Sequence, residues 1–437
     1  MKSPYKKSSH KKSSHKKSHK KSSKMMKSIF NKYNINPHVG NIIQIDVSAS
    51  KFDKILLDIV HLNPTLTEEK LRSRIEYDDD YDNYNAIKNL NFSDLNILFL
   101  PKSIKNLTVT NNLDLSKNGL KYLPDEFYKI KVGGDLFLNK NSLESLPDSF
   151  VNIKVGGSLD LSFNKLTLLS GFGNIKIGGN LDLRFNELTL LSGFGNLEIG
   201  GNLILSRNEL KSLPESFGDI KIGGNLELSH NQIRTLPESF GSLTIGGNLS
   251  LGWNKLRTLP ESFGDIEIGG DLNLSKNQLT SLPESFGRLK LGGNLNLYMN
   301  EELRTLPESF GNLEIGGNLD LGENRLTSLP KNFGNIKIGG NLNLGANYLE
   351  SLPESFGNIT LKKCLNLSEN KLETLPKSFG NIEIEGNLNL SNNNELISLP
   401  ESFVNITIGG YLYLSRNKLT LLPKSFVNLT KIEVVVI

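Results

Sequence analysis

A unit of about 23 residues recurs along most of the chain, and this period limits the fold more than any other feature of the sequence. One clean copy runs from Asn254 to Lys276, and the next opens at Asn277. A fixed period of about 20 to 50 residues is typical of a solenoid, in which each unit stacks on its neighbour. The units follow one another at a spacing of 22 to 24 residues, each opening on an Asn: Asn118, Asn141, Asn164, Asn186, Asn208, Asn231, Asn254, Asn277, Asn300, Asn324, Asn347, Asn370, Asn393 and Asn417.

Each unit predicts a strand, a tight turn and a short helical turn. Leu272 and Leu274 alternate with polar residues, which favours a strand. Asn277 ends this strand, and its amide can satisfy the backbone groups of a turn. Pro283 suits the start of a helical turn and Gly287 its exit. One unit buries too little apolar surface to offset its ordering entropy, so the copies must stack.

Two further features recur from unit to unit. A Phe in all fourteen units, from Phe127 to Phe426, predicts a continuous spine of stacked rings. The β-branched alternation from Ile266 to Ile268 predicts a second short parallel ladder beside the first. Gly269 and Gly270 follow it, and we expect this pair to let the backbone bend at the corner between the ladders.

The pattern Leu-x-Leu-x-x-Asn-x-Leu-x-x-Leu-Pro resembles that of the leucine-rich repeat family. The 23-residue length, with Leu-Pro-Glu-Ser-Phe-Gly-Asn-Leu, is similar to its intracellular class and covers about Leu90 to Thr430. Gly269 departs from the family, which usually has Leu at that place. The resemblance implies an α/β-type horseshoe solenoid with a parallel β-sheet on the concave face and short helical turns. The Asn, Lys and Ile bias also resembles the repeat proteins of giant viruses of amoebae.

Composition divides the chain into three parts: a basic Lys/Ser/His tail at 1–40, a helical cap at 41–89, and a solenoid of about 14 to 15 repeats at 90–437. Residues Met1 to Lys32 contain twelve Lys and no acid, so the remainder is modestly acidic. Such a tail is expected to be disordered. Two interpretations of it stay open. It either contacts nucleic acid, an anionic membrane or the nuclear import machinery, or it only keeps the chain soluble.

The cap is predicted from helical spacing. Thr65 to Glu68 resembles a capping box that opens a second helix. We expect the segment to cover the apolar end of the first repeat. The alternative is an adaptor domain such as an F-box, which precedes such repeats in ubiquitin-ligase adaptors. The first helix is indicated by apolar residues at helical spacing: Phe52, Ile55, Leu56, Ile59 and Val60.

The sequence favours an intracellular protein, either cytoplasmic or nuclear, that is not secreted. Cys364 is the single cysteine, whereas extracellular members of the family usually have disulfide-bonded caps. No apolar run is long enough for a membrane span, and the amino terminus lacks the apolar core of a signal peptide. We expect a monomer.

No catalytic set stands out in the sequence. His38, His61 and His230 lack spaced partners for a metal or a nucleophile. The repeated Gly-Gly is followed by a Leu-rich strand and not by the Lys-Ser/Thr of a phosphate loop. The sequence therefore predicts a protein that is not an enzyme and that uses no cofactor and no metal.

The solvent side of the first ladder carries the candidate binding site. The positions four, two and one before each Asn face the concave surface, and most hold Asp, Asn, Ser or Gly. Between Asn164 and Asn300 they become large, aromatic or basic, as at interface hot spots. The alternative is that each ring only packs against its neighbour along the ladder. The candidate partner-binding residues are Phe163, Arg184, Phe185, Arg207, His230, Trp253, Tyr298 and Met299.

We therefore expect a non-catalytic scaffold that binds a protein partner on the concave face of the solenoid. Two alternatives stay open. One is a substrate-recognition adaptor of a ubiquitin ligase, built on residues 42–90. The other is a tether to nucleic acid or an anionic membrane through the basic tail.

Overall fold

The computed structural model describes residues 50–77, 86–169, 172, 175–420, 422–423 and 433–435. Lys51–Ile437 forms one compact unit, and it is this unit that is described below. The basic tail predicted at 1–40 lies outside the described residues. No helix in the described part of the chain is both long and apolar enough to cross a lipid bilayer.

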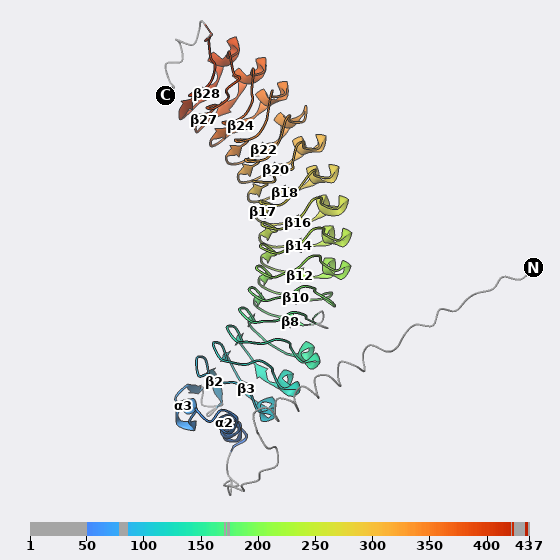
Figure 1. Ribbon diagram of the computed structural model, residues 1–437, viewed down its shortest axis with the longest axis vertical. Helices are drawn as coiled ribbons and strands as arrows, with labels where there is room; N and C mark the ends of the chain where they lie inside the picture. Colours follow the sequence, from blue (N-terminus) through green and yellow to red (C-terminus); the bar gives the residue numbers. More distant parts are fainter. Residues whose placement is uncertain are drawn as a thin grey trace, which may run out of the picture. The chain divides into compact units, whose positions relative to one another are not determined.

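The repeats build one long sheet in which each strand pairs with that of the next repeat. Within the described residues the sheet has seventeen strands, and all the pairings are parallel except that of the first two. The register keeps each leucine beside its counterpart, as in Leu249↔Leu272. Figure 1 shows these strands side by side along one side of a curved stack. The predicted repeat solenoid with a long parallel sheet is confirmed.

The strands of the long sheet, in chain order, are β1 (Ile75–Tyr77), β2 (Ile87–Asn91), β4 (Leu113–Asp114), β6 (Leu136–Phe137), β7 (Leu159–Asp160), β9 (Leu181–Asp182), β11 (Leu203–Ile204), β13 (Leu226–Glu227), β15 (Leu249–Ser250), β17 (Leu272–Asn273), β19 (Leu295–Asn296), β21 (Leu319–Asp320), β23 (Leu342–Asn343), β25 (Leu365–Asn366), β27 (Leu388–Asn389), β29 (Tyr411–Tyr413) and β30 (Glu433–Val435).

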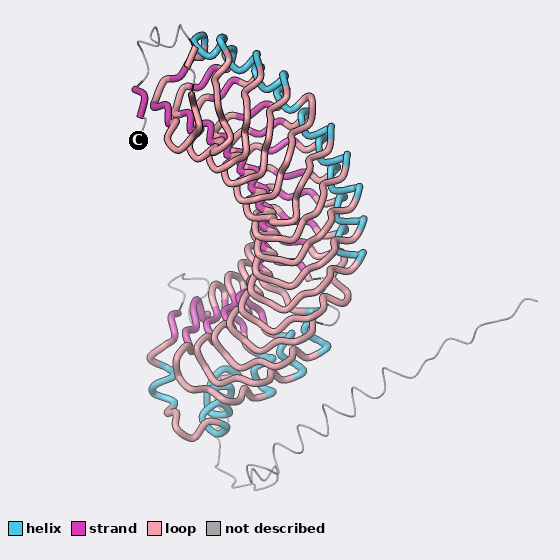
Figure 2. Tube along the Cα trace, turned by 45° about the horizontal axis from the view of Figure 1, so that its top comes forward, coloured by secondary structure: helices cyan, strands magenta, loops and turns pink. Residues whose placement is uncertain are grey.

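Most repeats turn back through one turn of 3-10 helix, which lies on the outer side of the stack (Figure 2), whereas the repeat that contains Phe194 has a plain turn there. Pro precedes most of these turns with its φ near −65°, and the buried Phe stands at the middle. The rings stack from Phe127 to Phe403 with centroids about 6 Å apart, so the predicted spine is observed over this range, and Phe426 lies outside the described residues. The turns are η2 (Lys102–Asn106), η3 (Asp125–Lys129), η4 (Asp148–Asn152), η6 (Glu215–Asp219), η7 (Glu238–Ser242), η8 (Glu261–Asp265), η9 (Glu284–Arg288), η10 (Glu308–Asn312), η11 (Phe333–Asn335), η12 (Glu354–Asn358), η13 (Lys377–Asn381) and η14 (Glu401–Asn405).

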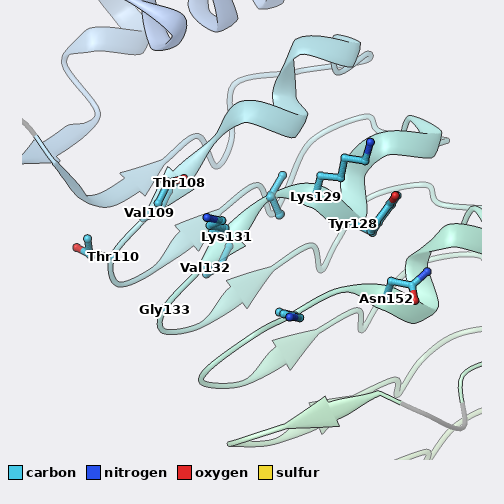
Figure 3. Close-up of a pocket in the computed structure, with 11 residues that line it drawn as sticks. Thr108, Val109, Thr110, Tyr128, Lys129, Lys131, Val132, Gly133 and Asn152 are labelled. Atoms are coloured by element: carbon cyan, nitrogen blue, oxygen red, sulfur yellow. The ribbon is translucent and has the colours of Figure 1, made fainter.

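After this turn, most repeats add a two-residue strand to a second parallel layer, as the Ile-x-Ile alternation predicted, and one repeat contributes only the bridge residue Val155. Figure 3 shows one step of it, with Lys131 and Val132 beside Thr108 and Val109. The layer falls into three described pieces. These are β3 (Thr108–Val109) with β5 (Lys131–Val132); then β8 (Lys176–Ile177), β10 (Glu198–Ile199), β12 (Lys221–Ile222), β14 (Thr244–Ile245), β16 (Glu267–Ile268), β18 (Lys290–Leu291), β20 (Glu314–Ile315) and β22 (Lys337–Ile338); then β24 (Thr360–Leu361), β26 (Glu383–Ile384) and β28 (Thr407–Ile408).

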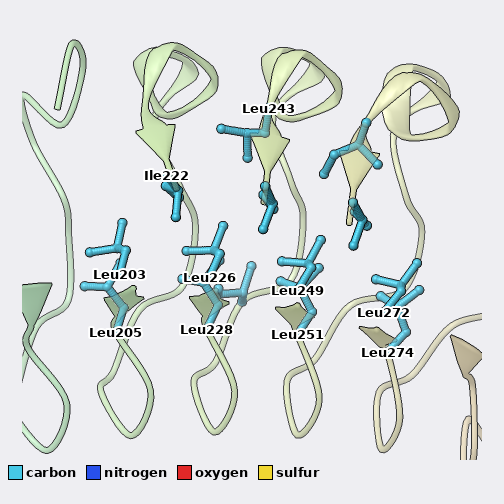
Figure 4. Close-up of a cluster of buried hydrophobic side chains, with 14 of the residues drawn as sticks. Leu203, Leu205, Ile222, Leu226, Leu228, Leu243, Leu249, Leu251, Leu272 and Leu274 are labelled. Carbon is cyan, nitrogen blue, oxygen red and sulfur yellow. The ribbon is translucent and has the colours of Figure 1, made fainter. Parts of the chain in front are cut away.

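The core fills the space between the two layers. Leu226 and Leu228 of one repeat are fully buried, and Figure 4 shows them pointing toward Ile222 of the second layer. The same arrangement repeats with Leu249 and Leu251 in the next repeat. Because each side chain packs on its own repeat and on both neighbours, burial is shared along the stack and no single repeat holds a separate core.

The repeated Asn ties consecutive repeats together. The Nδ2 of Asn254 donates to the carbonyl oxygens of Leu228 and Leu251, each at 3.0 Å. Its Oδ1 accepts a hydrogen bond from the backbone N–H of Ile233, also at 3.0 Å. The side chain thus satisfies buried backbone groups of two repeats, which is the structural role that the sequence predicted.

The Gly-Gly corner has a different physical basis from the predicted one. Among the described glycines only Gly193 has a positive φ, so the corner does not need left-handed backbone. A Cβ at Gly246 would collide with the backbone carbonyl oxygen of Gly223 in the preceding repeat. Glycine is therefore required here by the close approach of successive repeats. Where Lys362 and Lys363 replace the pair, β24 is not paired with β22.

Two helices and a short strand precede the first repeat. Helix α2 (Lys51–Leu62) buries Ile55, Leu56 and Ile59, and α3 (Glu68–Arg72) is capped by Thr67. Strand β1 then pairs antiparallel with β2. The segment predicted as a helical cap thus also extends the long sheet by one strand.

Candidate functional site

The residue immediately before each repeat Asn is held in a left-handed conformation. We call these residues the pre-Asn row. Their φ values lie between 51° and 58° in all fourteen units, from Lys117 to Arg416. Their backbone N–H groups bond to the next repeat, as in Trp253 N–H to the Ser275 carbonyl oxygen at 3.0 Å. This fixed backbone makes the row regular along the edge of the long sheet.

Phe163 and Phe185 are the first two aromatic residues of the pre-Asn row. Their rings stack with centroids 4.3 Å apart and planes 14° from parallel. The ammonium of Lys140 lies 5.6 Å from the Phe163 centroid, and the guanidinium of Arg207 lies 5.1 Å from that of Phe185. Both outer faces of this ring pair are therefore covered by a cation, a favourable arrangement for π systems.

His230 and Trp253 form a second stacked pair, with centroids 5.1 Å apart. The ammonium of Lys276 lies 3.9 Å from the Trp253 centroid, on the next repeat. Partial burial and the charges of Arg207 and Lys276 lower the pKa of the His230 imidazole. We call the seven residues the aromatic–cationic ladder: Lys140, Phe163, Phe185, Arg207, His230, Trp253 and Lys276.

The rings of the ladder stay open to solvent although they stack. Phe163 is 40% exposed, Phe185 39% and Trp253 50%. Neighbouring side chains cover the faces of these rings, so the part of each ring that solvent reaches is its edge. Ring edges carry partial positive charge. The ladder therefore offers apolar edges and cations together.

Arg184 lies two residues before its Asn and belongs to a different cluster. Its Nε is 3.0 Å from the carboxylate of Asp182, which faces Asp160 on the neighbouring strand. The pKa of the Asp182 carboxyl is raised to about 6, mainly by burial and also by the Asp160 charge, while the backbone N–H and the charge of Arg184 oppose the rise. Burial also raises the pKa of Glu227, farther along the same row. Three acids, Asp160, Asp182 and Glu227, thus lie on the strands beside the ladder, with Ile204 between the last two.

Tyr298 and Met299 lie toward the other end of the candidate site. A hydrogen bond with the Glu323 carboxylate is the main cause that raises the pKa of the Tyr298 phenol to about 12. Met299 continues the pre-Asn row with its N–H bonded to the Gly322 carbonyl oxygen.

The structure thus brings five of the eight candidate residues into one ladder and places Arg184 beside an acid. The predicted site does not include Lys140 and Lys276, which cover the rings of Phe163 and Trp253. Their position immediately before the repeat Asn was the signal that could have found them.

Within the described ranges, no three His, Cys, Asp or Glu side chains gather as a metal ion would require.

Comparisons with known proteins agree with this architecture. The family model described as Leucine Rich Repeat matches residues 271–289. A leucine-rich repeat protein of Leptospira interrogans is 30% identical over 80% of this chain and 88% of its own, with a TM-score of 0.54. No curated protein matches the chain.

Two further solved structures share the fold. YopM, a leucine-rich effector protein of Yersinia pestis, is 23% identical over 88% of this chain and 99% of its own, with a TM-score of 0.50. The Toll–Spätzle complex of Drosophila includes a chain that is 20% identical over 76% of this chain and 50% of its own, with a TM-score of 0.51.

Proposed function

Because the chain belongs to the leucine-rich repeat family, we propose that it is a non-catalytic scaffold that binds a protein partner on the inner face of its long sheet. The observation that carries this proposal is the aromatic–cationic ladder. Aromatic and Arg side chains dominate the binding energy of protein interfaces. Here they gather on consecutive repeats, while the same row holds Ala346, Glu369 and Asn392 farther along.

Stacking prepares the ladder for binding. Because each ring is already held by its neighbours, a partner need not immobilise it, and less entropy is lost on association. The strands are about 4.8 Å apart, so the repeats from Asn164 to Asn300 span roughly 30 Å. That length accommodates a standard interface of about 800 Å² on each partner.

The charges around the ladder favour a protein over a nucleic acid. The ring faces of Phe163, Phe185 and Trp253 are covered, so bases cannot stack on them. Asp160 and Asp182 on the neighbouring row would repel phosphates. A protein partner with acidic groups facing the ladder and basic groups facing Asp160 and Asp182 would have complementary charge.

The first helices support a capping role. The Asn63 side chain donates to the Phe99 carbonyl oxygen at 2.9 Å and accepts from the Leu98 N–H at 2.7 Å. The apolar face of α2 is buried, and Ser103 of the 3-10 turn η2 donates to Asp58 at 2.5 Å. These contacts favour a cap of the first repeat over an adaptor domain.

We also propose that the protein is intracellular, because a single cysteine, Cys364, leaves no pair for a stabilising disulfide. We likewise propose that the protein is a monomer. Contact of the basic tail with nucleic acid or an anionic membrane is the alternative that we propose.

Partner capture with substituted proteins tests the scaffold proposal. Trp253→Ala and Phe185→Ala should each weaken binding of a captured partner by about 1–2 kcal/mol, or roughly 5- to 30-fold. Ala346 already stands at the equivalent position with φ 53°, so the backbone accepts alanine there. The matched controls are Asn343→Ala and Asn366→Ala, farther along the same sheet. If both aromatic variants bind the partner as the unchanged protein does, the ladder is not the site.

A further inference from the structure

A hollow of about 570 Å³ lies on the second layer near its first strands, away from the aromatic–cationic ladder. Its walls are the buried apolar residues Val109, Ile130 and Val132. Figure 3 shows the side chains that surround it, which come from three consecutive repeats.

Three lysines line this hollow: Lys129, Lys131 and Lys154. All three side chains are exposed, and the ammonium of Lys129 lies 5.6 Å from the Tyr128 ring centroid. Among the described residues none of the three forms an ion pair, although several other lysines of the second layer do.

The rest of the second layer has a different charge pattern. We call the first residue of each second-layer step the outer row. From Lys176 onward this row alternates in charge or inserts Thr, and Glu198 pairs with Lys176 at 2.7 Å. Farther along, Glu314 pairs with Lys337 at 2.8 Å.

At the hollow the charges of the outer row do not alternate. Val155 bridges to Val132 on one side and to Ile177 on the other, so Lys154 stands between Lys131 and Lys176. Like charges on adjacent strands destabilise a sheet. Of the adjacent Lys131, Lys154 and Lys176, only Lys176 has a carboxylate partner among the described residues, and a bound anion would reduce the repulsion between the other two.

We propose that this hollow is a binding site for a ligand with clustered phosphate groups. Lys131 and Lys154 approach it from neighbouring strands, and Lys129 from the end of the preceding 3-10 turn. Ammonium groups bind phosphate as mobile point charges. Apolar walls on one side of the site strengthen that attraction by excluding water.

The ligand can be a free phosphate compound or the headgroup of a phosphorylated lipid, since both present the same chemistry. A ligand with two or more phosphate groups presents enough anionic oxygens to engage lysines that lie on different elements. The proposal does not depend on the partner site of the inner face.

The test uses the full chain and the substitution pair Lys131→Thr with Lys154→Thr. Threonine occupies the outer row naturally at Thr244, Thr360 and Thr407, so the second layer accepts it. The matched control, Lys165→Ser with Lys211→Ser, removes the same charge from exposed lysines elsewhere. The basic tail is the same in every variant.

The first readout is the melting temperature in 1 mM sodium pyrophosphate against sodium chloride of equal ionic strength. The unchanged protein and the control pair should gain ~2 °C or more, as expected for a ligand that binds only the folded state. The threonine pair should lose this gain and should melt higher than the unchanged protein when pyrophosphate is absent. An equal gain in all three proteins would overturn the proposal.

The second readout separates the two sources. Vesicles of phosphatidylcholine, with and without a phosphatidylinositol bisphosphate, are sedimented with each protein. A loss of sedimentation in the threonine pair but not in the control assigns the site to a lipid headgroup. A pyrophosphate effect with no such loss assigns it to a free phosphate compound.

Discussion

The ring of Phe163 stacks on that of Phe185 at 4.3 Å, although the two residues lie 22 positions apart and are each about 40% exposed. Their centroids are closer than those of the buried spine, where successive rings are about 6 Å apart. Both residues share the same left-handed backbone conformation, with φ 54°. Contact between repeats thus orders two side chains that are only partly buried.

The first prediction concerns the energy of this pair. Phe163→Ala and Phe185→Ala should each lower the free energy of unfolding by about 1 kcal/mol, since half-exposed rings bury little area. A double-mutant cycle should give a coupling of about 0.5–1.5 kcal/mol for the stacked rings. Urea unfolding measures both quantities. The comparison is Phe217→Ala in the buried spine, which should lose about 3–5 kcal/mol. A loss at Phe185 as large as that at Phe217 would show that the ladder is core.

The second prediction concerns the repeat Asn. Asn254→Ala removes four side-chain hydrogen bonds, among them those to the buried backbone groups of Leu228, Leu251 and Ile233. The free energy of unfolding should fall by about 2–4 kcal/mol. Asn139→Ala is the control, because that side chain lies two residues before an Asn on the solvent side. Chemical denaturation with equal losses in both variants would contradict the structural role of the Asn.

The third prediction separates two kinds of glycine. Gly246→Ala drives a Cβ into the backbone of Gly223, so the stability should fall by about 1–3 kcal/mol. Gly252→Ala meets only side-chain atoms at 3.2 Å, at a position where Ser stands in other repeats, so it should be neutral within about 0.5 kcal/mol. Thermal unfolding of the two variants checks the difference. A harmless alanine at Gly246 would mean that the repeats can move apart at the corner.

The fourth prediction concerns pH. Burial raises the pKa of Asp182 to about 6 from its ordinary 3.8, so ionisation of this carboxyl destabilises the folded chain. That unfavourable contribution is fully present above about pH 6 and disappears as the pH falls below about 4. Asp182→Asn keeps the oxygen that accepts from the Arg184 N–H.

At pH 7 the Asp182→Asn variant should therefore unfold with a free energy higher by about 1 kcal/mol, since water and Arg184 screen part of the charge. Below about pH 4 the two proteins should unfold alike. Denaturant titrations at several pH values give the comparison. A variant that is less stable at pH 7 would show that the ion pair with Arg184 outweighs burial.

The sequence alone was sufficient for the repeat and for most of the fold. The spacing of Asn, the alternation of Leu272 and Leu274, the recurring Phe and the β-branched Ile266 and Ile268 are local patterns. Each has one physical interpretation once the period is known, because every copy must bury the same face against the next. The long sheet, the second parallel layer, the Phe spine and the structural role of the Asn were predicted on that basis.

The tertiary structure decided the features that depend on how closely one repeat approaches the next. Gly246 is needed because the Gly223 carbonyl lies against it, which no pattern within one unit shows. Lys276 covers the Trp253 ring from the neighbouring repeat, and both residues have a left-handed φ. Contacts between residues about 23 positions apart follow from the register and curvature of the stack, and these are set only when the repeats pack together.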